Sequence, residues 1–182
     1  MKQYPNAAEG LRLMFIGQIV VIVGSLLIWV PLVGSLIVIA GTAAGLLGIY
    51  KAGADDENYR SALVFQAVNL VVGVVNGFLG DGILGSLLGI VSAVLGLLVV
   101  YTVCNTTSNL LHSVGNEPLA ERGQTVIKIY LACTAVSVVC QVLGVVPILN
   151  IIAGLAAAAA ALVQVVGYIM YLLFLSGSSK AL

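Results

Sequence analysis

The sequence predicts an all-α integral membrane protein with six transmembrane helices, arranged as three tandem helical hairpins in a pseudo-threefold parallel repeat. Three observations support this prediction. Of the 182 residues, 61% are hydrophobic and 8% are charged, and the mean hydropathy is +1.18, whereas a soluble domain carries about 25% charged residues. Six apolar stretches approach or exceed the roughly 20 residues that a helix needs to cross a bilayer. Three segments of the chain also align with one another without gaps.

The six apolar stretches come in three pairs within a single membrane domain, residues 1–182. A proline or glycine turn separates the two members of each pair, because these residues interrupt helices. The predicted spans are residues 12–30, 33–51, 61–79, 83–104, 125–146 and 148–175. They form hairpin repeats over 12–51, 61–104 and 125–175, joined by cytoplasmic connectors over 52–60 and 105–124.

The repeat itself is visible around the three turns. Residues 31–36, 82–87 and 147–152 align at offsets of 51 and then 65 residues. Internal similarity of this kind indicates one structural unit that occurs several times. It leaves open whether the three hairpins form a ring or a row.

The basic residues predict the orientation. All seven fall at the membrane edge or in the connectors on the side of the two termini, and the opposite side carries one charge, Asp81. The positive-inside rule therefore places both termini in the cytoplasm. The basic residues are Lys2, Arg12, Lys51, Arg60, Arg122, Lys128 and Lys180.

Small residues four positions apart recur in the second helix of each hairpin. Lipid removes most of the hydrophobic drive between helices, so close backbone packing must hold them together. The pattern predicts helix packing, and with it a homo-oligomer or association with other membrane subunits, in addition to contact with membrane lipid. The packing residues are Gly41, Gly45, Ser92, Gly96, Ala157 and Ala161.

Polar residues seven positions apart lie inside the first helix of each hairpin. Seven residues make two turns, about 10.5 Å along one face, so each of these helices presents polar side chains in two layers. Three interpretations are open: hydrogen bonds between helices, which contribute about 0.6–2 kcal/mol each, a path for a solute, or a coincidence of drift after duplication of the repeat. We call this set the polar stripe: Gln18, Ser25, Asn69, Asn76, Thr134 and Gln141.

The chemistry of most membrane enzymes and pumps is missing from the spans. Neither an acid nor a base nor a histidine occupies the middle of any predicted span, although proton pumps, coupled transporters and voltage sensors need such groups. The single histidine, His112, has no second ligand that would make a metal site. We therefore expect no catalytic residue, no metal and no cofactor, and the neutral net charge argues against nucleic acid as a partner.

Two segments resemble known proteins. Residues 4–11, Tyr-Pro-Asn-Ala-Ala-Glu-Gly-Leu, and residues 50–60, Tyr-Lys-Ala-Gly-Ala-Asp-Asp-Glu-Asn-Tyr-Arg, resemble segments of uncharacterised small multi-span membrane proteins of gut anaerobic bacteria. The resemblance implies a bacterial cytoplasmic (inner) membrane and no particular activity.

Two hypotheses of function follow. The first is a non-enzymatic packing, scaffold or accessory component that self-associates through its small-residue helix faces. The second is a channel or facilitator that passes a small neutral solute along the polar stripe.

Overall fold

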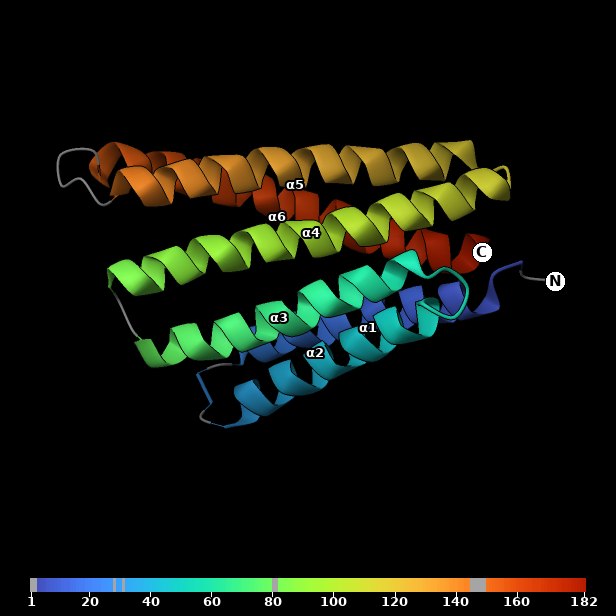
Figure 1. The fold of residues 1–182 in the computed structure, drawn as a ribbon, viewed down its shortest axis with the longest axis horizontal. Helices are drawn as coiled ribbons and strands as arrows, with labels where there is room; N and C mark the ends of the chain where they lie inside the picture. The colour runs from blue at the N-terminus through green and yellow to red at the C-terminus, as the bar shows by residue number, and fades with distance from the viewer. Residues whose placement is uncertain (1–2, 28, 31, 80–81, 145–149) are drawn as a thin grey trace.

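The computed structural model describes residues 3–27, 29–30, 32–79, 82–144 and 150–182, and these ranges contain six α-helices and no strands. Each helix is long and apolar enough to cross a membrane, which confirms the prediction of an all-α protein with six helices of membrane length. The helices run along the long axis of the molecule (Figure 1). They are α1 (Pro5–Leu26), α2 (Val33–Ala52), α3 (Asn58–Leu79), α4 (Ile83–Ser113), α5 (Glu117–Gly144) and α6 (Asn150–Ala181).

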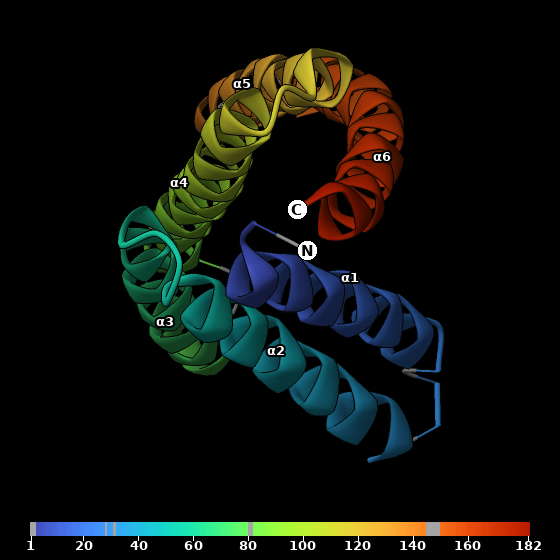
Figure 2. The same ribbon diagram turned by 90° about the vertical axis from the view of Figure 1, so that its right-hand side faces the viewer.

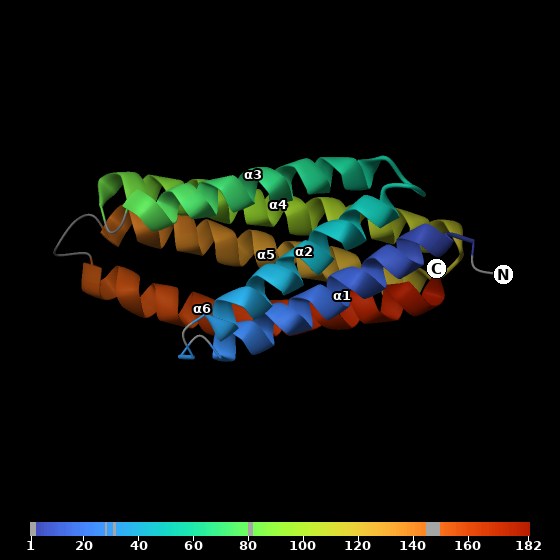
Figure 3. The ribbon, with the colours of Figure 1, turned by 90° about the horizontal axis from the view of Figure 1, so that it is seen from below.

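The helices form a closed ring. Each one packs against the next along the chain, and α6 packs against α1. Figure 2 shows α3 to α6 as an arc that the α1–α2 pair closes, and Figure 3 shows α1 and α6 side by side. We call the end of the bundle that holds both termini the terminal end, and the opposite end the far end (Figure 1). The equivalence of the three hairpins stays a prediction.

Three glycines of α1 face three glycines of α2, and the two backbones approach closely there. On both helices the glycines are seven residues apart, so they share one face. A methyl group added to Gly17 would lie 2.6 Å from the carbonyl oxygen of Gly41, and one added to Gly41 would lie 2.7 Å from that of Gly17. The two backbones therefore touch with no room for a side chain. The glycines are Gly10, Gly17, Gly24, Gly34, Gly41 and Gly48.

Four helices extend well beyond the predicted spans at the terminal end, each by six residues or more. The helix α1 begins at Pro5 rather than near residue 12, and α4 continues to Ser113 rather than ending at residue 104. The helix α5 begins at Glu117, before residue 125, and α6 continues to Ala181, beyond residue 175. Hydropathy detects where apolar residues stop, but backbone hydrogen bonding continues into polar sequence. The segment 105–124, predicted as a connector, is therefore mostly helical.

A glycine ends α4 sharply and allows α5 to begin after a turn of only three residues. Gly115 has a φ of +77°, a left-handed conformation that glycine adopts at low cost. Its amide donates to His112 O at 3.0 Å, and the amide of Asn116 donates to Leu111 O at 2.9 Å. These two bonds make a Schellman motif, which satisfies the last carbonyls of the helix.

Polar contacts join the loops and helix ends at the terminal end. The Asp55 carboxylate, in the turn between α2 and α3, accepts bonds from the Ala7 amide at 2.7 Å and from Asn6 Nδ2 at 2.8 Å. A negative charge at the N-terminus of α1 suits the helix dipole. At the start of α3 the neighbouring Asp56 accepts the Asn58 amide at 2.8 Å, so the two acids of this turn serve different helices.

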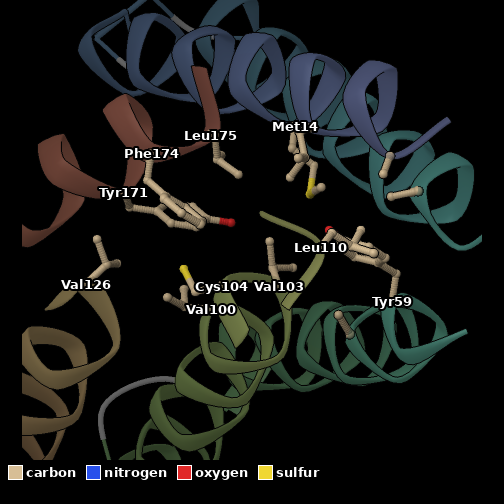
Figure 4. Close-up of a cluster of buried hydrophobic side chains, with 14 of the residues drawn as sticks. Met14, Tyr59, Val100, Val103, Cys104, Leu110, Val126, Tyr171, Phe174 and Leu175 are labelled. Atoms are coloured by element: carbon tan, nitrogen blue, oxygen red, sulfur yellow. The ribbon is translucent and has the colours of Figure 1, made fainter. Parts of the chain in front are cut away.

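The hydrophobic core lies toward the terminal end. Figure 4 shows side chains from α1, α3, α4, α5 and α6 pointing toward one another. Within it the Tyr59 and Thr107 hydroxyls lie 2.7 Å apart and share a buried hydrogen bond. Toward the far end the packing is looser, and α6 is exposed over residues 154–166 except at Ala160. Labelled core residues are Met14, Tyr59, Val100, Val103, Cys104, Leu110, Val126, Tyr171, Phe174 and Leu175.

The replacement Gly17→Ala is expected to lower the free energy of unfolding in detergent by about 1–3 kcal/mol, because the methyl group must push the α2 backbone away. Gly73→Ala is the matched control, since a methyl group there meets no atom within 4 Å and alanine favours helix. Equal losses in the two variants would show that the α1–α2 contact does not depend on glycine. Unfolding in a denaturing detergent, followed by circular dichroism, measures both.

Candidate functional site

A cavity of about 450 Å³ lies inside the ring, and a smaller one of about 150 Å³ adjoins it. The larger cavity is lined by α1, α3, α4, α5 and α6, and the smaller one by α1, α2, α3, α4 and α6. Gln18, Gln66, Val99 and Tyr171 line both. Together the two spaces, which we call the central cavity, therefore touch all six helices.

Amides and hydroxyls dominate the polar part of the lining. Each amide side chain offers both donors and an acceptor, and each hydroxyl can do either. The residues that line the central cavity in the described chain include no acid, no lysine, no arginine and no histidine. The polar lining consists of Gln18, Thr42, Gln66, Tyr130, Thr134, Ser137, Gln141, Gln164, Tyr168 and Tyr171.

Helical spacing places these groups on the inner faces of α5 and α6. On α5 the sequence Tyr130, Thr134, Ser137 and Gln141 follows steps of four, three and four residues. On α6 the steps from Gln164 to Tyr168 and Tyr171 are four and three. Residues three and four apart share a helix face, so each helix turns one face that carries polar side chains to the cavity.

A hydrogen bond between two residues of the cavity lining joins the first helix to the last. The Tyr168 hydroxyl donates to Gln18 Oε1 at 2.5 Å. Gln18 follows Gly17 in α1, so the glycine contact with α2 also sets where this amide lies. The bond ties α6 to α1, the two helices that close the ring.

The hydrophobic core forms the terminal side of the cavity. Met14, Val100 and Tyr171 belong both to the buried core and to the cavity lining. Beyond them Phe174 and Leu175 are almost fully buried. Packed side chains thus separate the central cavity from the terminal end.

The structure brings together three of the six residues of the polar stripe. Gln18, Thr134 and Gln141 line the central cavity. Asn69 lies between α3 and α4, where Ser92 Oγ donates to its Oδ1 at 2.6 Å. This bond joins two helices, as the hydrogen-bond interpretation of the polar stripe predicts.

The other two residues of the stripe lie nearer the far end. Ser25 is exposed. Asn76 is half-buried, and its Oδ1 is buried without a hydrogen-bond partner in the described chain. Neither residue lines the central cavity.

Sequence reasoning missed several lining residues, most notably Gln66, Ser137, Gln164 and Tyr168. Gln164 is an isolated amide within a long apolar segment, and that alone was a usable signal. Ser137 lies three residues from both Thr134 and Cys140, on the face of α5 already identified. Gln164 and Tyr168 were missed because the polar stripe was taken from the first helix of each hairpin. Gln66 and Ser137 were missed because the equivalent positions in the other two hairpins are apolar.

The predicted packing residues fall in three settings. Gly41 lies in the α1–α2 contact, and Ser92 bonds to Asn69. Gly45 and Gly96 line the central cavity. Ala157 and Ala161 are exposed, and they lie eleven and seven residues before Tyr168, on the same face of α6. They therefore continue the inner face of α6 toward the far end.

Groups that hold metals are dispersed. Among the described residues, no three His, Cys, Asp or Glu side chains come close enough to bind an ion together. The three cysteines, Cys104, Cys133 and Cys140, are buried and free. His112 Nδ1 lies 2.5 Å from Glu117 Oε2 across the α4–α5 turn, so its contact is with the start of α5, away from the cavity.

Comparisons with protein-family models, with curated proteins and with solved structures give no match to this chain. The resemblance to membrane proteins of gut anaerobes therefore stays a prediction. The central cavity, with its neutral polar lining, is the feature of the structure that bears most directly on function.

The bond between Tyr168 and Gln18 can be tested with a double-mutant cycle. Tyr168→Phe and Gln18→Leu, alone and together, should show a coupling free energy of about 0.6 kcal/mol, as is typical of such bonds in membrane proteins. Tyr101→Phe is the control, because Tyr101 is exposed on α4. If Tyr168→Phe costs the same in the Gln18→Leu protein as in the unmodified one, the two groups are not coupled. Unfolding in mixed detergent micelles gives the four free energies.

Proposed function

We propose that this protein binds a small, neutral, polar solute inside the ring of six helices and facilitates its passage across a membrane. The observation that supports this most strongly is the lining of the central cavity, which is rich in amides and hydroxyls and lacks charged groups in the described residues. The volume of about 450 Å³ falls within the range of about 300–1,000 Å³ that is typical of small-molecule sites.

The chemistry of the lining favours a neutral solute over an ion. A polar solute that leaves water loses its hydrogen bonds, and unreplaced bonds cost about 1–3 kcal/mol each. Gln66, Gln141 and Gln164 can replace them with both donors and acceptors. An ion would need a compensating charge in the lining, because an uncompensated charge within a bilayer is costly.

The core at the terminal end makes the described arrangement a closed one. Passage through the protein therefore requires the side chains around Tyr171 and Phe174 to separate. The bond between Tyr168 and Gln18 lies next to this region, and its loss would let α6 move from α1. We propose this seam between α1 and α6 as the moving part.

The orientation and the repeat complete the proposal. All six basic residues within the described chain belong to the half of the molecule near the terminal end. By the positive-inside rule this distribution supports our proposal that the terminal end faces the cytoplasm, and the sequence resemblance supports a bacterial inner membrane. The three hairpins then enclose the cavity as related units. The alternative hypothesis, self-association through small residues, receives less support from the geometry. Gly41 and Ser92 make contacts within the chain, and Gly45, Gly96, Ala157 and Ala161 lie on inner faces.

The double replacement Gln66→Leu with Gln164→Leu is expected to lower solute flux about tenfold, because two hydrogen-bonding groups are each worth about 0.5–1.5 kcal/mol. The measurement is stopped-flow light scattering of proteoliposomes with urea, glycerol or acetamide as the solute. Gln124→Leu serves as the matched control, since this glutamine of α5 does not line the central cavity.

Two results would contradict the proposal. Flux that is unchanged by the double replacement would show that the amides do not contact the solute. Permeability no higher than that of empty liposomes, for every solute in the series, would remove the transport function itself.

The orientation has its own test in whole cells, with a maleimide that does not cross membranes. Positions 29 and 61 are both exposed in the structure, but Trp29 lies at the far end and Ser61 at the terminal end. Trp29→Cys should therefore be labelled, and Ser61→Cys should not. The reverse pattern would place the termini outside. The native cysteines are buried and provide a low background.

A further inference from the structure

A second hollow, of about 690 Å³, lies at the terminal end where α1, α2 and α3 meet. We call it the basic groove. Its described lining combines aliphatic side chains with two cations, Lys51 and Arg60, and contains no acid. It shares no lining residue with the central cavity.

The lining changes along the groove from charged to apolar. Lys51 and Arg60 lie close to the turn between α2 and α3, at the membrane edge. Leu47 lies five residues before the end of α2, and Val64 lies six residues after the start of α3. Each lies four residues from the cation on its own helix, so at 1.5 Å per residue these aliphatic side chains are about 6 Å deeper than Lys51 and Arg60.

We propose that the basic groove binds one anionic phospholipid. The phosphate lies at Arg60 and Lys51, and an acyl chain lies along Leu47 and Val64. The groove is lined by cations at the membrane edge and by aliphatic side chains below it, which matches the headgroup and acyl chains of a lipid in a membrane. Basic pockets between membrane helices on the cytoplasmic side bind such headgroups.

The two cations have acidic neighbours, which set their roles. Arg60 Nη1 lies 3.6 Å from Glu57 Oε1, and both side chains are mostly exposed, at 69% and 86%. An ion pair exposed to water is weak, so the guanidinium of Arg60 is available to bind a phosphate. Its planar fork suits two phosphate oxygens. Lys51 Nζ lies 2.6 Å from Glu9 Oε1 and is the secondary contact.

Tyr50 adds a third feature that fits a lipid. Its side chain is 71% exposed and lines the groove beside Lys51. Tyrosine favours the membrane interface, where its ring meets hydrocarbon and its hydroxyl meets headgroups. The inference uses the membrane location proposed above but not the solute, so a protein that transports nothing could still bind the lipid.

The test is native mass spectrometry of the purified protein in mild detergent, titrated with phosphatidylglycerol and, separately, with phosphatidylcholine of the same acyl chains. One tightly bound phosphatidylglycerol is expected. The double variant Lys51→Gln with Arg60→Gln should bind it about 25-fold more weakly, at about fivefold for each cation. The matched control, Arg122→Gln with Lys128→Gln, removes two exposed cations of α5 and should leave the affinity unchanged.

A second variant tests the apolar part and keeps the proposal testable if the charge variant does not fold. Leu47→Trp fills the groove and retains both cations, so it should also weaken binding. The proposal is overturned if both lipids bind alike, if the α5 control loses as much affinity, or if Leu47→Trp binds normally. Displacement of the lipid by inorganic phosphate at equal concentration would also overturn it, because the site would then recognise a free anion.

Discussion

The contact between the glycine faces of α1 and α2 is the interaction on which the rest of the ring depends. In a bilayer, apolar side chains gain little by leaving lipid for another helix, so association depends on close packing and hydrogen bonds. Gly17 and Gly41 bring two backbones together with no space for a methyl group. This contact fixes the adjacent Gln18 on the inner side of α1, and it holds the α2–α3 turn where Asp55 can cap α1.

The two ends of the molecule are built differently, and this difference creates the site. At the terminal end, aromatic and aliphatic side chains from five helices fill the centre of the ring (Figure 4). Toward the far end, the inner faces carry small or polar residues, such as Gly96, Ala161 and Gln164, and these do not fill the space. The cavity is therefore closed by large apolar side chains on its terminal side and lined by polar side chains around it, because the size of the inward side chains changes along the axis of the ring.

The seam between α1 and α6 and the junction between α2 and α3 have complementary roles in this arrangement. The Tyr168 to Gln18 bond closes the ring at the seam. At the α2–α3 junction the helices leave a groove at the terminal end, where the proposed lipid would supply the packing that side chains do not. A lipid bound there would support the wall formed by α2 without entering the cavity.

Composition, hydropathy and the turn residues alone determined the number of helices and their membrane length, because a chain in lipid must satisfy its backbone within each helix. They could not predict the helix ends, since α4 and α5 continue through polar sequence until Gly115 turns the chain. For the site, spacing within one helix identified Thr134 and Gln141. Only the tertiary structure decided that Gln66 and Gln164 join them, that Asn69 bonds to Ser92, and that Ser25 stays exposed. The reason is physical: the direction in which a polar face points depends on rotation of each helix against its neighbours, and contacts such as the α1–α2 glycines set that rotation.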